Sequence, residues 1–69
     1  MLDFMRLAPG TFTAKSQKHP GRHYVLIEGV SRGYEVWIEE ELENLIRPHR
    51  LAESMPLAHA VALANKNER

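Results

Sequence analysis

The 69-residue sequence contains no cysteine, so disulfide bonds, iron–sulfur clusters and thiolate zinc sites are excluded. No run of apolar residues approaches the roughly 18 that a membrane-spanning helix requires. The four glycines never form a G-x-G pattern, so a glycine-rich phosphate-binding loop is also absent. These absences exclude thiol chemistry, a membrane span and the commonest way of cradling a phosphate.

The length of the chain limits it to one domain, which we place at residues 1–69. A chain this short buries only roughly 60% of the surface that its unfolded form exposes, so its core is marginal. Without disulfides or a metal clip, pairing with a second copy is the simplest way to enlarge that core, and we expect a homodimer. The first eight residues lack the basic region of a secretory signal, and we expect a cytoplasmic protein.

The nine basic and nine acidic residues cancel, but they are unevenly distributed along the chain. Residues 1–33 carry five basic residues against two acidic ones, and residues 47–69 carry four against two. Residues 34–46 carry five glutamates and no basic residue. An acidic segment between two basic ones influences the choice of partner more than the fold.

Two strand-like segments, residues 22–30 and 34–38, are the clearest elements of the sequence. Both are rich in β-branched and aromatic residues and are bounded by turn residues. The connection between them ends at Gly33, where a three-residue hairpin loop needs a left-handed residue. We therefore predict a β-hairpin across residues 22–38. Residues 11–14 predict a further, edge strand.

The glutamate-rich segment 39–46 fits two structures. Counted from Ile38, its apolar residues recur at the i, i+4, i+7 and i+8 positions of a helical stripe, and glutamate favours helices, so we expect a helix. In a strand, three of those four residues would lie on the same face as Val36, so a longer second strand is the alternative. We expect Pro48 to end the segment in either case.

A C-terminal helix is expected after a connector, or a short third strand, at residues 48–53. Ser54 is a favourable N-cap, Pro56 suits the first turn, and residues 65–67 should fray the end. Its apolar stripe is Leu57, Ala60, Val61 and Ala64. The predicted fold class is therefore α+β, with a small antiparallel β-hairpin or sheet packed with one or two short helices.

No group of side chains forms a recognisable catalytic or metal-binding set. Ser54 with His49 or His59 is conceivable as a nucleophile–base pair, but the N-cap role already accounts for the serine. His19 and His23 are four residues apart, yet a Pro-Gly pair between them excludes a shared helix face. We expect a protein that is not an enzyme and that holds no cofactor and no metal.

Parity within the predicted hairpin places Trp37 on the opposite face from Val36 and Ile38. We expect the aliphatic face to pack on the C-terminal helix and the other face to gather Trp37, Tyr24 and Leu26 within a charged rim, as interaction surfaces do. Burial of Trp37 in the core, or against a second copy of the chain, is the alternative. The predicted partner-binding residues are Trp37, Tyr24, Tyr34, Arg32, Glu39, Glu40, Glu41 and Glu43.

Nucleic-acid binding is the alternative function. Basic residues in the N-terminal half could gather near one end of the hairpin to contact phosphates. These residues are Lys15, Lys18, Arg22 and Arg32. Against this, an isoelectric point near 6.9 is far from that of a typical phosphate-binding domain, and the glutamates of residues 35–43 would repel the backbone.

Three segments carry a resemblance in layout: Tyr24 to Glu28 (YVLIE), Tyr34 to Ile38 (YEVWI) and the helix at residues 56–64 (PLAHAVALA). Together they look like the sheet-plus-helix layout of many small phage proteins. In size, lack of cysteine and acidic patching, the chain is similar to inhibitors of bacterial defence, including anti-CRISPR proteins. The resemblance implies a stoichiometric inhibitor that binds a host protein complex, and it assigns no residues. Protein binding is thus the predicted function.

Overall fold

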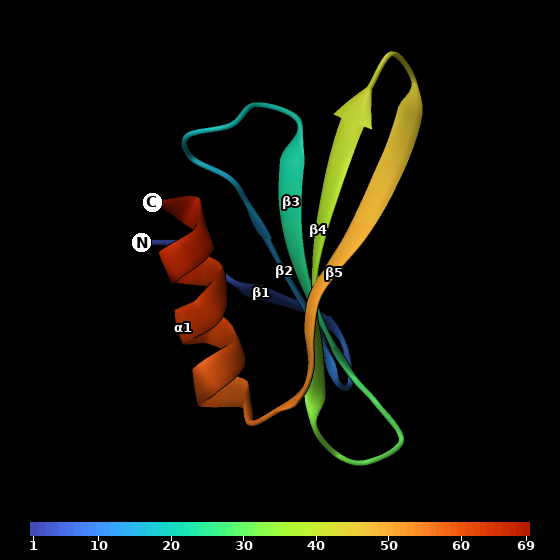
Figure 1. Cartoon of the computed structure of the whole chain (residues 1–69), viewed down its shortest axis with the longest axis vertical. Coiled ribbons are helices and arrows are strands. Elements are labelled where there is room, and N and C mark those ends of the chain that lie inside the picture. Colours follow the sequence, from blue (N-terminus) through green and yellow to red (C-terminus); the bar gives the residue numbers. More distant parts are fainter.

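Five strands and one helix form the structure, a computed structural model that describes residues 1–69. The elements are β1 (Met5–Ala8), β2 (Thr11–Lys15), β3 (Arg22–Glu28), β4 (Tyr34–Leu42), β5 (Leu45–Met55) and α1 (Leu57–Glu68). Each strand pairs antiparallel with the next, so the sheet order follows the chain, and α1 lies beside the sheet with both chain ends close to it (Figure 1). The predicted α+β class and the predicted hairpin are confirmed, whereas β2 is an interior strand and not an edge.

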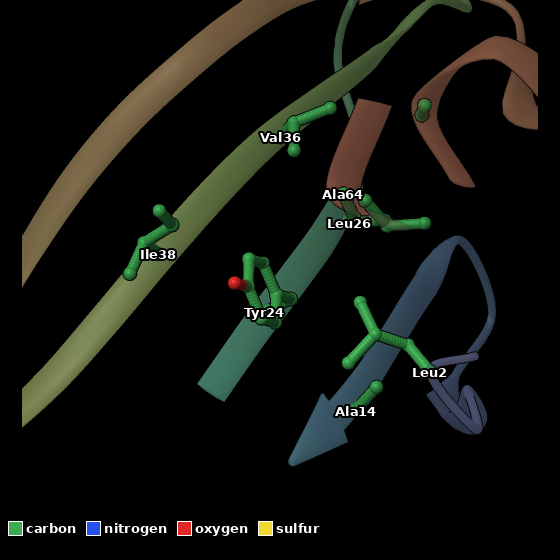
Figure 2. Packing of buried hydrophobic residues seen from close by; sticks show 8 residues of the cluster. Leu2, Ala14, Tyr24, Leu26, Val36, Ile38 and Ala64 are labelled. Carbon is green, nitrogen blue, oxygen red and sulfur yellow. The ribbon is translucent and has the colours of Figure 1, made fainter. Parts of the chain in front are cut away.

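The core forms where side chains of β3 and β4 point toward α1. Tyr24 lies opposite Ile38 and Leu26 lies opposite Val36, and all four are buried (Figure 2). The helix contributes two buried alanines, whose single methyl groups allow its backbone to approach the sheet closely. The buried apolar side chains are Leu2, Ala14, Tyr24, Leu26, Val36, Ile38, Ala60 and Ala64.

Residues 39–46 form a strand, a turn and the start of another strand, so the predicted helix is wrong. β4 continues to Leu42, β5 begins at Leu45, and Glu43 and Asn44 make the turn. Both turn residues have positive φ, 50° and 69°, as in the type I′ turns that match the twist of a two-residue hairpin. A right-handed helix requires negative φ at both positions. The alternative of a longer second strand is confirmed as far as Leu42.

The outer part of the β4–β5 hairpin, residues 39–49, extends away from α1 and is named the arm (Figure 1). Pro48 lies inside β5, opposite Glu39, and does not end the segment as predicted. Hydrogen-bonded pairs alternate from the Leu42–Leu45 pair that closes the turn, so the Pro48 nitrogen points away from β4. Because β5 is an edge strand, the missing N–H costs no hydrogen bond within the sheet.

The C-terminal helix begins and ends differently from the prediction. Pro56 occupies the N-cap position without a side-chain hydrogen bond, and Ser54 belongs to the end of β5. The helix continues through residues 65–67 to Glu68, because hydrogen bonds described below hold that residue in place. With 12 residues, α1 is too short to cross a bilayer, and no other helix is present.

Gly33 is required by close packing and not by a left-handed conformation. A Cβ atom at this position would lie 2.4 Å from the Cα of Ser54, which leaves no room for any side chain. The left-handed residue of the β3–β4 loop is instead Arg32, with φ of 66°. The prediction of a left-handed residue at Gly33 is therefore wrong, and the glycine is required by its close approach to Ser54 instead.

Candidate partner-binding face

The sheet has one covered face and one bare face. α1 is the only element that packs on the sheet, and it covers the face that carries Leu26 and Val36. The other face carries Val25 and Trp37 and is named the open face. Its side chains include Met5, Thr13, Lys15, His23, Val25, Ile27, Glu35, Trp37, Glu39 and Arg50. An uncovered sheet face with large apolar side chains is typical of an interaction surface.

Trp37 lies on the open face, half-buried and outside the core. Its Nε1 donates a hydrogen bond to Oε1 of Glu35 at 2.9 Å, and the guanidinium carbon of Arg50 lies 6.0 Å from the ring centroid. A cation in such a position contributes about 0.5–1 kcal/mol at an exposed site. The indole is therefore held by its neighbours while part of its surface is available to a partner. The sequence had left open whether this side chain belongs to the core.

A hollow of about 270 Å³ lies in the open face. Its lining residues are Leu7, Thr13, His23, Val25, Glu39, Glu41 and Ile46. Aliphatic side chains from β1, β3 and β5 form apolar walls, and both glutamates belong to β4. A second hollow of about 480 Å³ shares Thr13 and His23 with the first and continues to Asp3 and Lys15. The open face is thus concave and combines apolar and acidic groups.

Tyr24 and Leu26 do not share the face of Trp37, so this part of the predicted surface is wrong. Tyr24 lies opposite Ile38 and is fully buried with Leu26 beneath α1, whereas the residue opposite Trp37 is Val25. Parity within each strand was predicted correctly, but the pairing between the strands was not. A shift of one residue in register moves every side chain of a strand to the other face relative to its neighbour.

Two other predicted residues also lie away from Trp37. Tyr34 is half-buried on the covered face, with its ring centroid 6.1 Å from that of Phe12. Arg32 is exposed in the loop between β3 and β4, at the opposite end of β4 from the arm. Neither residue belongs to the face that carries Trp37.

The four predicted glutamates are divided between the two faces. Glu39 and Glu41 line the hollow, whereas Glu40 points to the other face and forms a 3.2 Å salt bridge with Arg22. Glu43 lies in the turn at the tip of the arm. Of the predicted partner-binding set, the structure places three residues on the open face: Trp37, Glu39 and Glu41.

The basic residues predicted for nucleic-acid binding do not form one stripe. Lys15 belongs to the open face, and Arg22 points to the opposite face. Lys18 donates a hydrogen bond from Nζ to the backbone oxygen of Arg69 at 3.2 Å. Arg32 lies at the other end of the β3–β4 pair. A nucleic-acid backbone running along one surface could not contact all four together.

Glu68, in the last turn of α1, is a buried carboxylate that the sequence did not reveal. Its Oε1 accepts hydrogen bonds from Ser16 Oγ at 2.7 Å and Tyr24 OH at 3.1 Å, and its Oε2 accepts from the amides of Gln17 at 2.6 Å and Lys18 at 3.2 Å. Burial raises the pKa of Glu68, but these four hydrogen bonds lower it by more. The resulting pKa is about 2, below the ordinary value of 4.5. A carboxylate so fully occupied anchors the β2–β3 loop and is not poised to transfer protons.

Sequence reasoning missed several residues of the hollow. Leu7 lies in a segment too short to assign, and Ile46 lies in a segment predicted as helix. Thr13 was placed on an edge strand with no neighbour on its outer side. The alternation of Val25 with its neighbours was the only sequence signal for an apolar wall of the hollow.

The structure contains no group of three histidine, aspartate or glutamate side chains that could hold a metal ion. The only side-chain hydrogen bond of Ser54 joins its Oγ to Oγ of Ser31 at 3.5 Å, so no serine–histidine pair is formed by this residue. Comparison with protein-family models, curated proteins and solved structures finds no match. The open face and its hollow are therefore the features from which a function is inferred.

Proposed function

We propose that the chain is a non-enzymatic protein-binding module whose contact surface is the open face. The observation that carries this proposal is the half-buried Trp37 on a sheet face that no helix covers. A tryptophan held by its neighbours binds effectively, because it buries a large area and loses little conformational freedom. Charged residues around it, including Lys15 and Glu35, provide the polar rim of such an interface.

The charges of the open face favour a protein partner over a nucleic acid. Glu35, Glu39 and Glu41 lie on this face and would repel phosphates, whereas only Lys15 of the predicted basic set lies there. We expect partner binding to persist at about 0.5 M salt, where charges are screened beyond a few ångströms. Binding to generic DNA or RNA that weakens steeply with salt would favour the nucleic-acid alternative instead.

The resemblance to small phage inhibitors leads us to propose that binding is stoichiometric and blocks part of a host protein complex in the cytoplasm. A second copy of the chain is the alternative occupant of the same face. Light scattering across a dilution series distinguishes the two. If the measured mass stays at that of one chain at high concentration, the open face is free to bind a different protein. If the mass is that of two chains and Trp37→Ala reduces it to that of one, the open face is the site of self-association.

The test of the proposed surface measures binding and stability separately. Trp37→Ala should weaken binding to the partner isolated from the native host by at least about tenfold, which corresponds to about 1.4 kcal/mol. Val30→Ala is the matched control, because Val30 is an apolar side chain fully exposed in the β3–β4 loop, and it should leave the affinity unchanged. Unfolding of the Trp37 variant without a separable effect on binding, or equal losses in both variants, would contradict the proposal.

A further inference from the structure

The two carboxylates in the hollow have no cation from the protein itself. Glu39 and Glu41 are two residues apart on β4, so both belong to the same face of the sheet. Neither takes part in a salt bridge or a side-chain hydrogen bond, whereas Glu40 is paired with Arg22 on the other face. The residue opposite Glu39 on β3 is His23. The hollow therefore carries two unpaired negative charges.

The walls of the hollow are suited to a hydrocarbon chain. Leu7, Val25 and Ile46 supply aliphatic surface from three different strands. The volume of about 270 Å³ is below the roughly 300 Å³ at which pockets for drug-sized ligands begin, so the hollow fits one side chain better than a whole small molecule. A side chain with an aliphatic stem and a cationic end would match both the walls and the two carboxylates.

We propose that the hollow receives an arginine side chain of the partner protein, an inference that rests on the proposed function of the open face. Residues two apart on a strand are separated by roughly 7 Å along the backbone, so the two carboxylates are spread over a wider area than one ammonium group covers. A guanidinium group is planar and presents five N–H donors in different directions, so it can face both carboxylates at once. It is also more weakly hydrated than an ammonium and enters a partly apolar hollow more readily.

Arginines of the same molecule do not fill this position. Arg50 lies over Trp37 and forms a 3.3 Å salt bridge with Glu53. Arg22 is paired with Glu40 on the other face, and Arg47 lies opposite that same glutamate on β5. No basic residue of the chain forms a salt bridge with Glu39 or Glu41, so a cation in the hollow would come from a second molecule. Charge complementarity and the apolar walls favour a protein with an exposed arginine between apolar residues.

The first experiment uses short peptides as probes for the full chain. Acetyl-Leu-Arg-Leu-amide is titrated and followed by the methyl NMR signals of Leu7, Val25 and Ile46, with Leu42, on the opposite face of the arm, as the internal control. Two matched probes replace the arginine. Citrulline keeps the shape and removes the charge, and lysine keeps the charge and removes the planar set of donors. We expect the arginine peptide to bind at least about tenfold more tightly than the citrulline and lysine peptides, because only guanidinium combines charge with a planar set of donors. Equal binding of the arginine peptide and either of the others would overturn the proposal.

The second experiment changes the hollow. The double variant Glu39→Gln, Glu41→Gln should weaken binding of the arginine peptide by about tenfold or more, because it removes both charges and preserves the side-chain size. Glu43→Gln removes a charge from the same acidic segment, at the tip of the arm, and should change the affinity by less than about twofold. Equal losses of affinity in the double variant and in Glu43→Gln would contradict the proposal, because they would show that peptide binding depends only on the net charge of the segment. Ile46→Ala, which shortens an apolar side chain in the wall of the hollow, should also weaken binding of the peptide, although it leaves the charges of the hollow unchanged.

Partner capture separates this inference from the proposed function. If Trp37→Ala abolishes capture and the double glutamine variant does not, the open face binds the partner without an arginine in the hollow, and only the inference fails. If neither change affects capture, both fail. If the double variant instead dissociates a dimer in light scattering, the occupant is a second copy of the chain, and the assignment to another protein is overturned.

Discussion

Neighbouring residues of β3 and β4 meet two different environments. Toward α1, Leu26 and Val36 are fully buried, whereas on the open face Ile27 is 40% exposed and Trp37 is half-buried. All four of these side chains are apolar, so hydrophobicity alone does not decide which of them are buried. The position of one short helix decides it. The chain has more apolar surface than its helix can cover, and the excess forms the candidate binding surface.

The largest expected effect compares two consecutive residues of β3. Leu26→Ala should lower the free energy of unfolding by about 2–5 kcal/mol, because it leaves a cavity in a fully buried site. Ile27→Ala, on the open face, should lower it by less than about 1 kcal/mol, because that side chain is already partly in water. Urea denaturation of the two variants measures the difference. Equal losses would mean that the open face is covered in solution, as in a stable dimer.

A smaller effect is expected where α1 is attached to the β2–β3 loop. The pKa of Glu68 is lowered from its ordinary value of 4.5 to about 2, so the folded state keeps this carboxylate ionised more readily than the unfolded state. Its contribution to stability is therefore complete above about pH 4.5 and is lost as the pH falls toward about 2. Glu68→Gln should destabilise the protein at neutral pH and flatten the dependence of stability on pH in that interval. Thermal unfolding between pH 2 and 7 tests this, and an unchanged pH profile would contradict the anchoring role.

The smallest expected effect concerns the tip of the arm. Replacing Glu43 and Asn44 by Asn-Gly should stabilise the protein by up to about 1 kcal/mol, because both positions have positive φ, which Asn-Gly adopts with less strain. In a helix the same change would instead be destabilising, since asparagine and especially glycine are weak helix formers. A shift in the urea midpoint shows directly whether the change raises or lowers the free energy of unfolding. Because the arm is remote from α1, burial of the covered face should not change.

The parts of the fold that the sequence predicted are those in which local signals agree. The hairpin at residues 22–38 combines β-branched residues, alternation and turn residues, and both strands formed as expected. The C-terminal helix has spaced apolar residues, of which Ala60 and Ala64 became its buried contacts. In each segment the apolar residues fit either the strand period or the helix period but not both. The structure that buries them is therefore the one that the pattern indicates.

The parts that the sequence did not predict depend on pairing between distant segments. The apolar residues of segment 39–46 fit both periods, and its turn contains neither glycine nor proline to mark it. The β3–β4 register, which separates Tyr24 from Trp37, is fixed by contacts across the hairpin and not by parity. Glu68 meets Ser16 across 52 positions of sequence, so no local pattern could indicate their hydrogen bond. The candidate site was accordingly predicted only at Trp37, Glu39 and Glu41.

The proline inside β5 has a consequence for the behaviour of the protein in concentrated solution. An eleven-residue strand at the border of a sheet offers a row of unpaired N–H and C=O groups, to which further chains can add side by side until fibres form. The ring of Pro48 removes one donor from that row, and the charges of Arg47 and Arg50 on either side oppose the approach of an identical strand. Both features oppose the edge-to-edge addition of further chains, a property that neither folding nor partner recognition would by itself require.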